Sequence, residues 1–185
     1  MTWNEIKVCK TITIPRQLLC ILLPIAVLGC DPPSSTITND VAPANTTPAE
    51  VLSTGDGDTL KVRSKDGTSS KIRIGCIDAP ESSQEYGPEA GQRLKALLPS
   101  GITIELWEIT TDQYGRTVAE IYSEGKSVGL QLVQEGYAVV YHRYLEGCSA
   151  TADQYIAAEE EARSQKLNFW SQSNPEMPWD FRRSR

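Results

Sequence analysis

Apolar and polar residues alternate along two neighbouring stretches of the chain, and this pattern predicts a β-hairpin. The stretches are 57–65 (GDTLKVRSK) and 70–78 (SKIRIGCID), with Asp66-Gly67 between them. Asp-Gly between two alternating runs is a strong signal for a tight turn. We therefore expect two antiparallel strands here, with order in the chain beginning near Val51.

Three other segments have the residue spacing or composition of helices. Apolar residues fall on one stripe of 86–99, and prolines stand near its start and at its end. The stretch 127–136 predicts a short helix, and 151–166 consists largely of good helix formers. Further strands are predicted over 102–109, 116–123 and 137–144.

The order of these elements predicts the fold class. The links between neighbouring strands are shorter than the crossovers that a parallel sheet requires. Strands followed by helices in this order favour an α+β fold, a five-stranded OB-fold-type β-barrel with three α-helices. A chain of 185 residues without a visible internal repeat suits one compact domain.

The first thirty residues differ from the rest of the chain. Basic residues precede the apolar run 18–29, and Cys30 follows it. The run holds about 12 apolar residues, whereas a membrane-spanning helix needs roughly 20, so 1–29 is typical of a secretory signal peptide. The ending VLGC resembles the lipobox of bacterial lipoproteins, which implies cleavage before Cys30 and lipidation of Cys30. A plain signal peptide, or a tilted anchor with an incidental cysteine, is the alternative.

Residues 30–50 are rich in Pro, Ser, Thr and Asn and show no apolar periodicity, which predicts a disordered tether. We therefore expect an exported protein, held by a lipid anchor at a membrane, on its periplasmic or cell-surface side. Two cysteines then remain in the domain, Cys76 and Cys148. In an oxidising compartment they are a candidate disulfide; alternatively, Cys76 packs in its strand as a small hydrophobe.

Arg73 and Asp78 stand toward opposite ends of one predicted strand. Their separation is odd, so in a regular strand their side chains would face opposite sides. Pro80 cannot continue a central ladder and restricts the residue before it. We therefore expect the strand to break at 78–80, which would free Asp78 to turn toward Arg73.

Two more polar clusters are turn-like when each is considered alone: Asp56 and Asp58 flank a glycine, and Arg116 follows Tyr114-Gly115. Considered together, the three clusters predict a site for metal and phosphate. Asp58 and Asp78 can hold a hard divalent cation through oxygen, and Arg73 and Arg116 can fork onto one phosphate. Glu81 is left as a base for water. These parts suffice for metal-assisted phosphodiester hydrolysis, although the net charge of −6 excludes bulk electrostatic coating of nucleic acid.

Several ordered motifs resemble the thermonuclease family, whose type member is staphylococcal nuclease. The similar region runs from about Val51 to Ser171, which we take as the domain, with 172–185 as a C-terminal tail. PWDFR within that tail is similar to the endings of bacterial relatives. The motifs are DGDTL (56–60), IRIGCIDAPE (72–81), YGPEA (86–90), DQYGR (112–116) and LNFWS (167–171).

The resemblance implies a Ca²⁺-dependent nuclease that cleaves DNA and RNA and leaves 3′-phosphate ends. By position, Asp58 and Asp78 match the metal-binding aspartates, and Ala79 matches the residue whose main-chain carbonyl also binds the metal. Glu81 matches the general base, and Arg73 and Arg116 match the arginines that hold the scissile phosphate. Tyr114 and Tyr144 match tyrosines of the nucleotide pocket.

The chain also departs from the type member. Its loop 81–86 is shorter, its domain is acidic, and His142 stands where the type member has a further pocket tyrosine. We expect His142 to be a surface residue at a strand end rather than part of the pocket. A monomer is expected. A nucleic-acid-binding module without catalysis, or a structural or adhesive lipoprotein, is the alternative, but neither needs all five of the site residues 58, 73, 78, 81 and 116.

Overall fold

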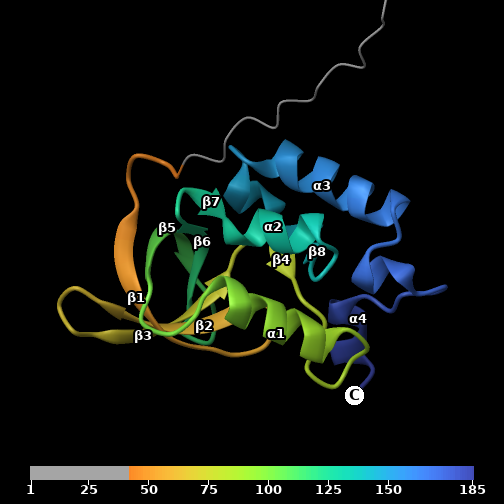
Figure 1. Cartoon of the computed structure of the whole chain (residues 1–185), viewed down its shortest axis with the longest axis horizontal. Helices are drawn as coiled ribbons and strands as arrows, with labels where there is room; N and C mark the ends of the chain where they lie inside the picture. Colours follow the sequence, from red (N-terminus) through yellow and green to blue (C-terminus); the bar gives the residue numbers. More distant parts are fainter. Residues whose placement is uncertain (1–41) are drawn as a thin grey trace, which may run out of the picture. The chain divides into compact units, whose positions relative to one another are not determined.

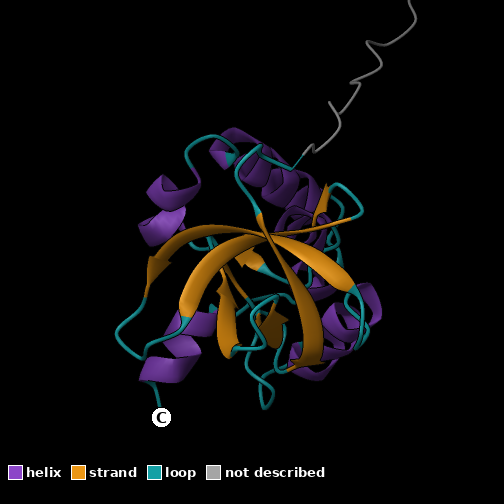
Figure 2. Ribbon diagram, turned by 90° about the vertical axis from the view of Figure 1, so that its left-hand side faces the viewer, coloured by secondary structure: helices purple, strands orange, loops and turns teal. Residues whose placement is uncertain are grey.

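Five strands close into a barrel in the computed structural model, which describes residues 42–185. The sheet order is β3-β2-β1-β5-β6, and parallel pairing of β3 with β6 closes it. Figure 2 shows the strong curvature of these strands. The expected α+β fold with an OB-type barrel is therefore confirmed. The barrel strands are β1 (Thr47–Thr54), β2 (Thr59–Ser64), β3 (Ser69–Ile74), β5 (Thr103–Thr111) and β6 (Thr117–Ser123).

Alternation within the strands fills the barrel with branched apolar side chains. Val62, Ile72 and Ile74 on the predicted hairpin are buried, as are Ile104 and Ile121 on the next two strands. Their polar neighbours along the strands are more exposed, as the burial pattern of β2 shows. Removal of this apolar surface from water supplies the main drive for closing the barrel.

Three helices pack beside the barrel, and α2 lies between α1 and α3 (Figure 1). Each covers a shorter range than the sequence predicts, because the end residues are caps or turns. The α2 helix starts where the Ser127 hydroxyl accepts a hydrogen bond from the Leu130 amide at 3.2 Å. The helices are α1 (Gly87–Leu97), α2 (Val128–Gln134) and α3 (Ala152–Ser164); a two-residue strand, β7 (Lys126–Ser127), precedes α2.

The strand β1 begins at Thr47 rather than near Val51. Ala49 and Val51 point into the core, while antiparallel pairing with β2 and β5 satisfies the backbone of β1. Residues 47–50 resemble the preceding segment in composition, so the sequence did not reveal that the side chains of β1 alternate between more and less buried positions as in a strand. A protein trimmed at Val51 would lose half of a central barrel strand.

The strand expected over 137–144 is wrong in extent. Only β8 (Val139–Val140) is extended, and it pairs with β4 (Ile77–Asp78) in a separate two-stranded sheet. Because β4 has only two residues, β8 can form only two residue pairs with it. The chain then turns into the 3₁₀ helix η1 (His142–Cys148).

The strand over 70–78 breaks earlier than Pro80. Regular pairing ends at Ile74, and Cys76 has a φ of 66°, in the left-handed region that non-glycine residues rarely adopt. The break therefore lies at 75–76, between Arg73 and Asp78. In an unbroken strand those two side chains would face opposite sides, and the break removes that restriction.

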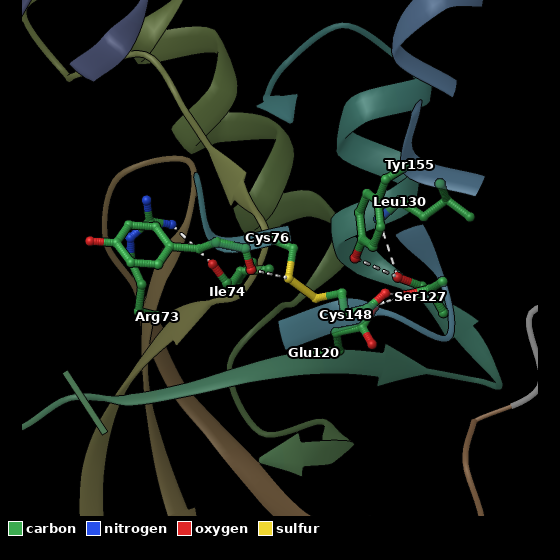
Figure 3. The surroundings of a disulfide bond; sticks show 10 residues. Arg73, Ile74, Cys76, Glu120, Ser127, Leu130, Cys148 and Tyr155 are labelled. Atoms are coloured by element: carbon green, nitrogen blue, oxygen red, sulfur yellow. Dashed lines mark hydrogen bonds between the residues drawn. A yellow bond between two sulfur atoms is a disulfide. The ribbon is translucent and has the colours of Figure 1, made fainter. Parts of the chain in front are cut away.

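A disulfide joins this break to η1. The sulfur atoms of Cys76 and Cys148 are bonded, with their Cα atoms 6.3 Å apart. Figure 3 shows Arg73 on one side of the bond and Ser127 and Tyr155 on the other. The bond fixes η1, which carries Tyr144, against the strand segment that carries Arg73.

The C-terminal segment, expected to be a tail, contains a fourth helix, α4 (Pro178–Arg183), after the 3₁₀ helix η2 (Asn168–Ser171). Pro178 lies in its first turn, where the fixed φ of proline suits a helix. Met177 and Trp179 pack against a second apolar cluster that includes Val139 and Phe169. The segment therefore belongs to the folded domain.

The expected signal peptide, Cys30 and most of the expected tether lie outside the described residues. Between residues 42 and 185, no helix is both long enough and apolar enough to cross a membrane.

The disulfide predicts a large difference between oxidised and reduced protein. Its cysteines are 72 positions apart, and a covalent link across a loop of that size stabilises a fold by about 4 kcal/mol in the chain-entropy description. We expect Cys76→Ser/Cys148→Ser to lower the free energy of unfolding by about that amount in urea titrations. Reductant should lower the stability of the wild type but not of the variant; equal stability of oxidised wild type and variant would contradict this prediction.

Candidate active site

Asp58 is held where β2 begins. A side chain at the preceding residue, Gly57, would place its Cβ 2.7 Å from the Cβ of Ala79, so glycine there allows the two segments to approach. The Ala79 amide donates a hydrogen bond to Asp58 Oδ2 at 2.8 Å. Burial raises the pKa of the Asp58 carboxyl from 3.8 to about 7, although the nearby Arg73 guanidinium acts in the opposite direction.

Arg73 bridges the two predicted metal-binding aspartates. Its Nη1 lies 2.8 Å from Asp58 Oδ2, and its Nη2 lies 2.8 Å from Asp78 Oδ1. The Asp78 side chain is fully buried, and pairing of β4 with β8 fixes its backbone. The expectation that Asp78 turns toward Arg73 is confirmed, and one planar guanidinium brings both carboxylates to the same place.

Glu81 follows on the loop after β4. A Cβ on Gly87, the first residue of α1, would lie 1.8 Å from the Glu81 carbonyl oxygen, so only glycine lets the helix start against this loop. The Glu81 amide donates to Gln84 Oε1 at 3.2 Å. These contacts fix the backbone at Glu81, whose side chain is 30% exposed and lines the cavity described below.

Arg182 of α4 is a site residue that the sequence interpretation missed. Its Nη2 lies 2.7 Å from Asp78 Oδ2, and its Nη1 donates to Glu81 Oε1 at 2.8 Å. The PWDFR motif was visible in the sequence, but 104 positions separate Arg182 from Asp78. No local pattern predicts a contact across that distance.

Arg116 stands at the start of β6, apart from the carboxylates that Arg73 bridges. Its Nε donates to Asp112 Oδ2 at 2.7 Å, and Asp112 Oδ1 also accepts from the Tyr114 and Arg116 amides at 2.9 Å each. The turn between them uses Gly115 with a φ of 75°. The Asp112 carboxylate thus fixes the arginine, and the guanidinium carbon lies 5.4 Å from the centre of the Tyr114 ring.

One open cavity of about 920 Å³ is lined by most of these groups, although Asp78 and Ala79 are not in its lining. It is lined by both predicted arginines and both predicted tyrosines, and Tyr114 and Tyr144 are 75% and 56% exposed. Tyr141 and Arg143 line it as well and were not predicted. His142 instead lies 3.6 Å from Glu159 on α3, in keeping with a surface position. The predicted site residues in the lining are Asp58, Arg73, Glu81, Tyr114, Arg116 and Tyr144.

The predicted metal-site residues could bind a hard divalent cation through only a few oxygen ligands. In the region that the structure describes, no group of three His, Cys, Asp or Glu side chains has the arrangement of a metal centre. Two carboxylates are nevertheless adjacent, since one guanidinium contacts both Asp58 and Asp78. Carboxylate oxygen with a main-chain carbonyl such as that of Ala79, completed by water, is a donor set that suits Ca²⁺ or Mg²⁺.

Comparison with known families gives the same region of the chain. A family model described as "Staphylococcal nuclease homologue" matches residues 71–172, more than half of the chain. The chain belongs to the staphylococcal nuclease family. Arg73, Asp78, Glu81 and Arg116 lie inside the matched range, whereas Asp58 and Arg182 lie outside it.

Individual members of the staphylococcal nuclease family extend the comparison. A protein named micrococcal nuclease from Shigella flexneri is 38% identical over 144 residues, covering 73% of this chain and 80% of its own. An uncharacterized endonuclease from Haemophilus influenzae is 32% identical over 133 residues, with 72% and 71% covered. A staphylococcal-like nuclease from Arabidopsis thaliana is 35% identical over 115 residues, but the match spans only 34% of its length.

The pKa of Asp58 predicts a specific pH dependence of stability in the absence of metal. Because the folded-state pKa is raised, the unfolded chain loses this proton at lower pH than the folded chain does, so stability falls as pH rises from about 4 to about 7. The full effect is on the order of 4 kcal/mol. In urea titrations with chelator across this range, Asp58→Asn should lack this component of the slope. Parallel slopes for wild type and variant would contradict the shift.

Proposed function

We propose that this protein is a calcium-dependent nuclease that hydrolyses phosphodiester bonds of DNA, RNA or both and leaves 3′-phosphate ends. The observation that carries the proposal is the junction at Arg73. There, the buried Asp78 and the cavity-lining Asp58 meet on one guanidinium, in a cavity that Glu81 and Arg116 also line. Membership of the staphylococcal nuclease family supports it.

The arginines are suited to hold the scissile phosphate. Arg116 uses Nε for Asp112, which leaves its two terminal nitrogens to donate to phosphate oxygens. Arg73 lines the same cavity, but both of its terminal nitrogens contact aspartates in this structure. It would turn a nitrogen to the phosphate once a cation holds those carboxylates. Positive charge placed where negative charge develops on the phosphorus oxygens stabilises the transition state.

Glu81 is suited to orient a water molecule or take its proton. Its carboxylate is partly exposed at the cavity wall, whereas Asp58 and Asp78 are buried. Tyr114 and Tyr144 present exposed rings that can stack on bases regardless of sequence. When bound at Asp58, Asp78 and the Ala79 carbonyl, Ca²⁺ would supply Lewis-acid polarisation of the phosphate.

Cleavage assays with matched variants test this function. Single-stranded DNA and RNA would be incubated with the full chain in Ca²⁺ or in chelator, with product ends identified by mass spectrometry. We expect Arg73→Ala and Arg116→Ala each to lower the rate by about 10³-fold or more. Glu81→Gln should lower it by about 10²- to 10⁴-fold.

Arg63→Gln is the matched control, because Arg63 is an exposed arginine of β2 that pairs with Glu50. It should cleave at the wild-type rate. Near-full activity in both Arg73→Ala and Arg116→Ala would overturn the assignment. Binding of DNA without cleavage by wild type in every metal condition would favour the non-catalytic binding module instead.

We further propose that the protein is exported, lipidated at Cys30 and anchored at a membrane as a monomer. The signal-like sequence 1–29, the VLGC ending and the tether-like composition of 30–50 support this placement. The disulfide between Cys76 and Cys148 fits an oxidising compartment.

Replacing Cys30 tests the anchor separately from catalysis. In cells supplied with labelled palmitate, the wild type should take up label and sediment with membranes. Cys30→Ser should do neither, while its soluble protein cleaves nucleic acid as before. Membrane sedimentation of Cys30→Ser equal to that of wild type would show that a lipid on Cys30 is not the anchor.

A further inference from the structure

Arg182 occupies the carboxylates that the proposed function assigns to metal and to water. Its Nη2 lies 2.7 Å from Asp78 Oδ2, and its Nη1 donates to Asp78 Oδ1 at 3.1 Å and to Glu81 Oε1 at 2.8 Å. One guanidinium therefore spans both oxygens of Asp78 and reaches Glu81 as well. This is the geometry in which arginine binds carboxylate most strongly.

The helix that carries Arg182 is attached to the domain by separate contacts. The Trp179 ring stacks on Tyr141, with ring centroids 5.2 Å apart and an angle of 5° between the planes. The Gln84 side-chain amide donates to the Glu176 carbonyl at 2.6 Å. Arg182 is thus held at the carboxylates by the docking of α4, although 39% of its side chain remains exposed.

The Asp78 carboxylate has little capacity left for another ligand. Its two oxygens contact three guanidinium nitrogens, one from Arg73 and two from Arg182, and an ionised carboxylate offers about four acceptor positions. A divalent cation at Asp78 would also stand against the positive charge of Arg182. Cation and Arg182 therefore compete for the same oxygens, by occupancy and by charge.

We propose that Arg182 is a resident cation of the site, which neutralises Asp78 and Glu81 in the metal-free protein and is exchanged for the divalent cation on loading. Arg182 is in this sense a residue that sets the affinity of the site for metal. The inference rests on the proposed metal site at Asp58 and Asp78.

Exchange has a consequence for α4. Linkage is reciprocal, so if docking of Arg182 weakens cation binding, cation binding weakens docking of Arg182 by the same factor. Release of the guanidinium removes the hydrogen bonds that α4 donates to Asp78 and Glu81. The segment 173–185 should accordingly exchange its amide hydrogens faster when the cation is bound.

Calorimetric titration of the full chain with Ca²⁺ tests the competition directly. We expect Arg182→Gln to bind Ca²⁺ about three- to thirtyfold more tightly than wild type, and Arg182→Lys to restore much of the competition. Arg183→Gln is the matched control, because Arg183 belongs to the same helix and pairs with Asp180 on its exposed side. It should bind Ca²⁺ as wild type does.

Hydrogen exchange of the wild type, followed by mass spectrometry, keeps the test valid if a variant fails to fold. Peptides from 173–185 should exchange at least severalfold faster in Ca²⁺ than in chelator, while peptides from β5 should not change. Weaker Ca²⁺ binding by Arg182→Gln would show that Arg182 positions Asp78 for the metal, and would overturn the proposal. Unchanged affinity, or unchanged exchange, would overturn it too.

The same titrations separate this inference from the proposed function. Ca²⁺ binding that is lost in Asp58→Asn but unaltered in Arg182→Gln would support the proposed metal site and contradict the exchange with Arg182. Absence of Ca²⁺ binding in both wild type and Arg182→Gln removes both. Binding by Arg182→Gln alone would support the exchange in its strongest form.

Discussion

The contact of Arg73 with Asp58 and Asp78 is the interaction on which the rest of the site depends. Both carboxylates are buried, and an uncompensated buried charge costs several kcal/mol. Asp58 directly precedes β2, Arg73 lies on β3 and Asp78 on β4, so one guanidinium joins three successive segments of the chain. Closing this end of the barrel and assembling the acidic pair are therefore the same structural event.

The left-handed residue at Cys76 makes that contact possible and extends its influence. The turn at 75–76 redirects the chain so that Asp78 can face Arg73, and the cysteine at the turn is bonded to Cys148 on η1. The Cys76 Sγ also lies 3.4 Å from the carbonyl oxygen of Tyr144. The position of the exposed tyrosine is thus tied, through a covalent bond, to the turn that orients the aspartate.

The sequence predicted what local pattern controls and missed what distant contacts decide. Apolar spacing placed α1 nearly to its ends, because one face of the helix is buried, and helix propensity did the same for α3. The meeting of Arg73 and Asp78 was expected, but its cause was placed at Pro80, since no propensity predicts a left-handed Cys76. The strand β1 and the contacts of Arg182 depend on partners far along the chain, which a single sequence does not reveal.

The charge of the cavity links the cation to the phosphate. Four arginines and five carboxylates line it (arginines 73, 116, 143 and 182; acids 56, 58, 81, 112 and 146), so these groups are close to balance in a protein whose net charge is −6. A divalent cation would turn their small formal excess of negative charge into one of positive charge, without any movement of the barrel. Release of Arg182 from Asp78 would add a free guanidinium at the same wall. In this acidic protein, the attraction of a polyanion to the cavity would then depend on cation binding in the cavity and not on the net charge of the whole surface.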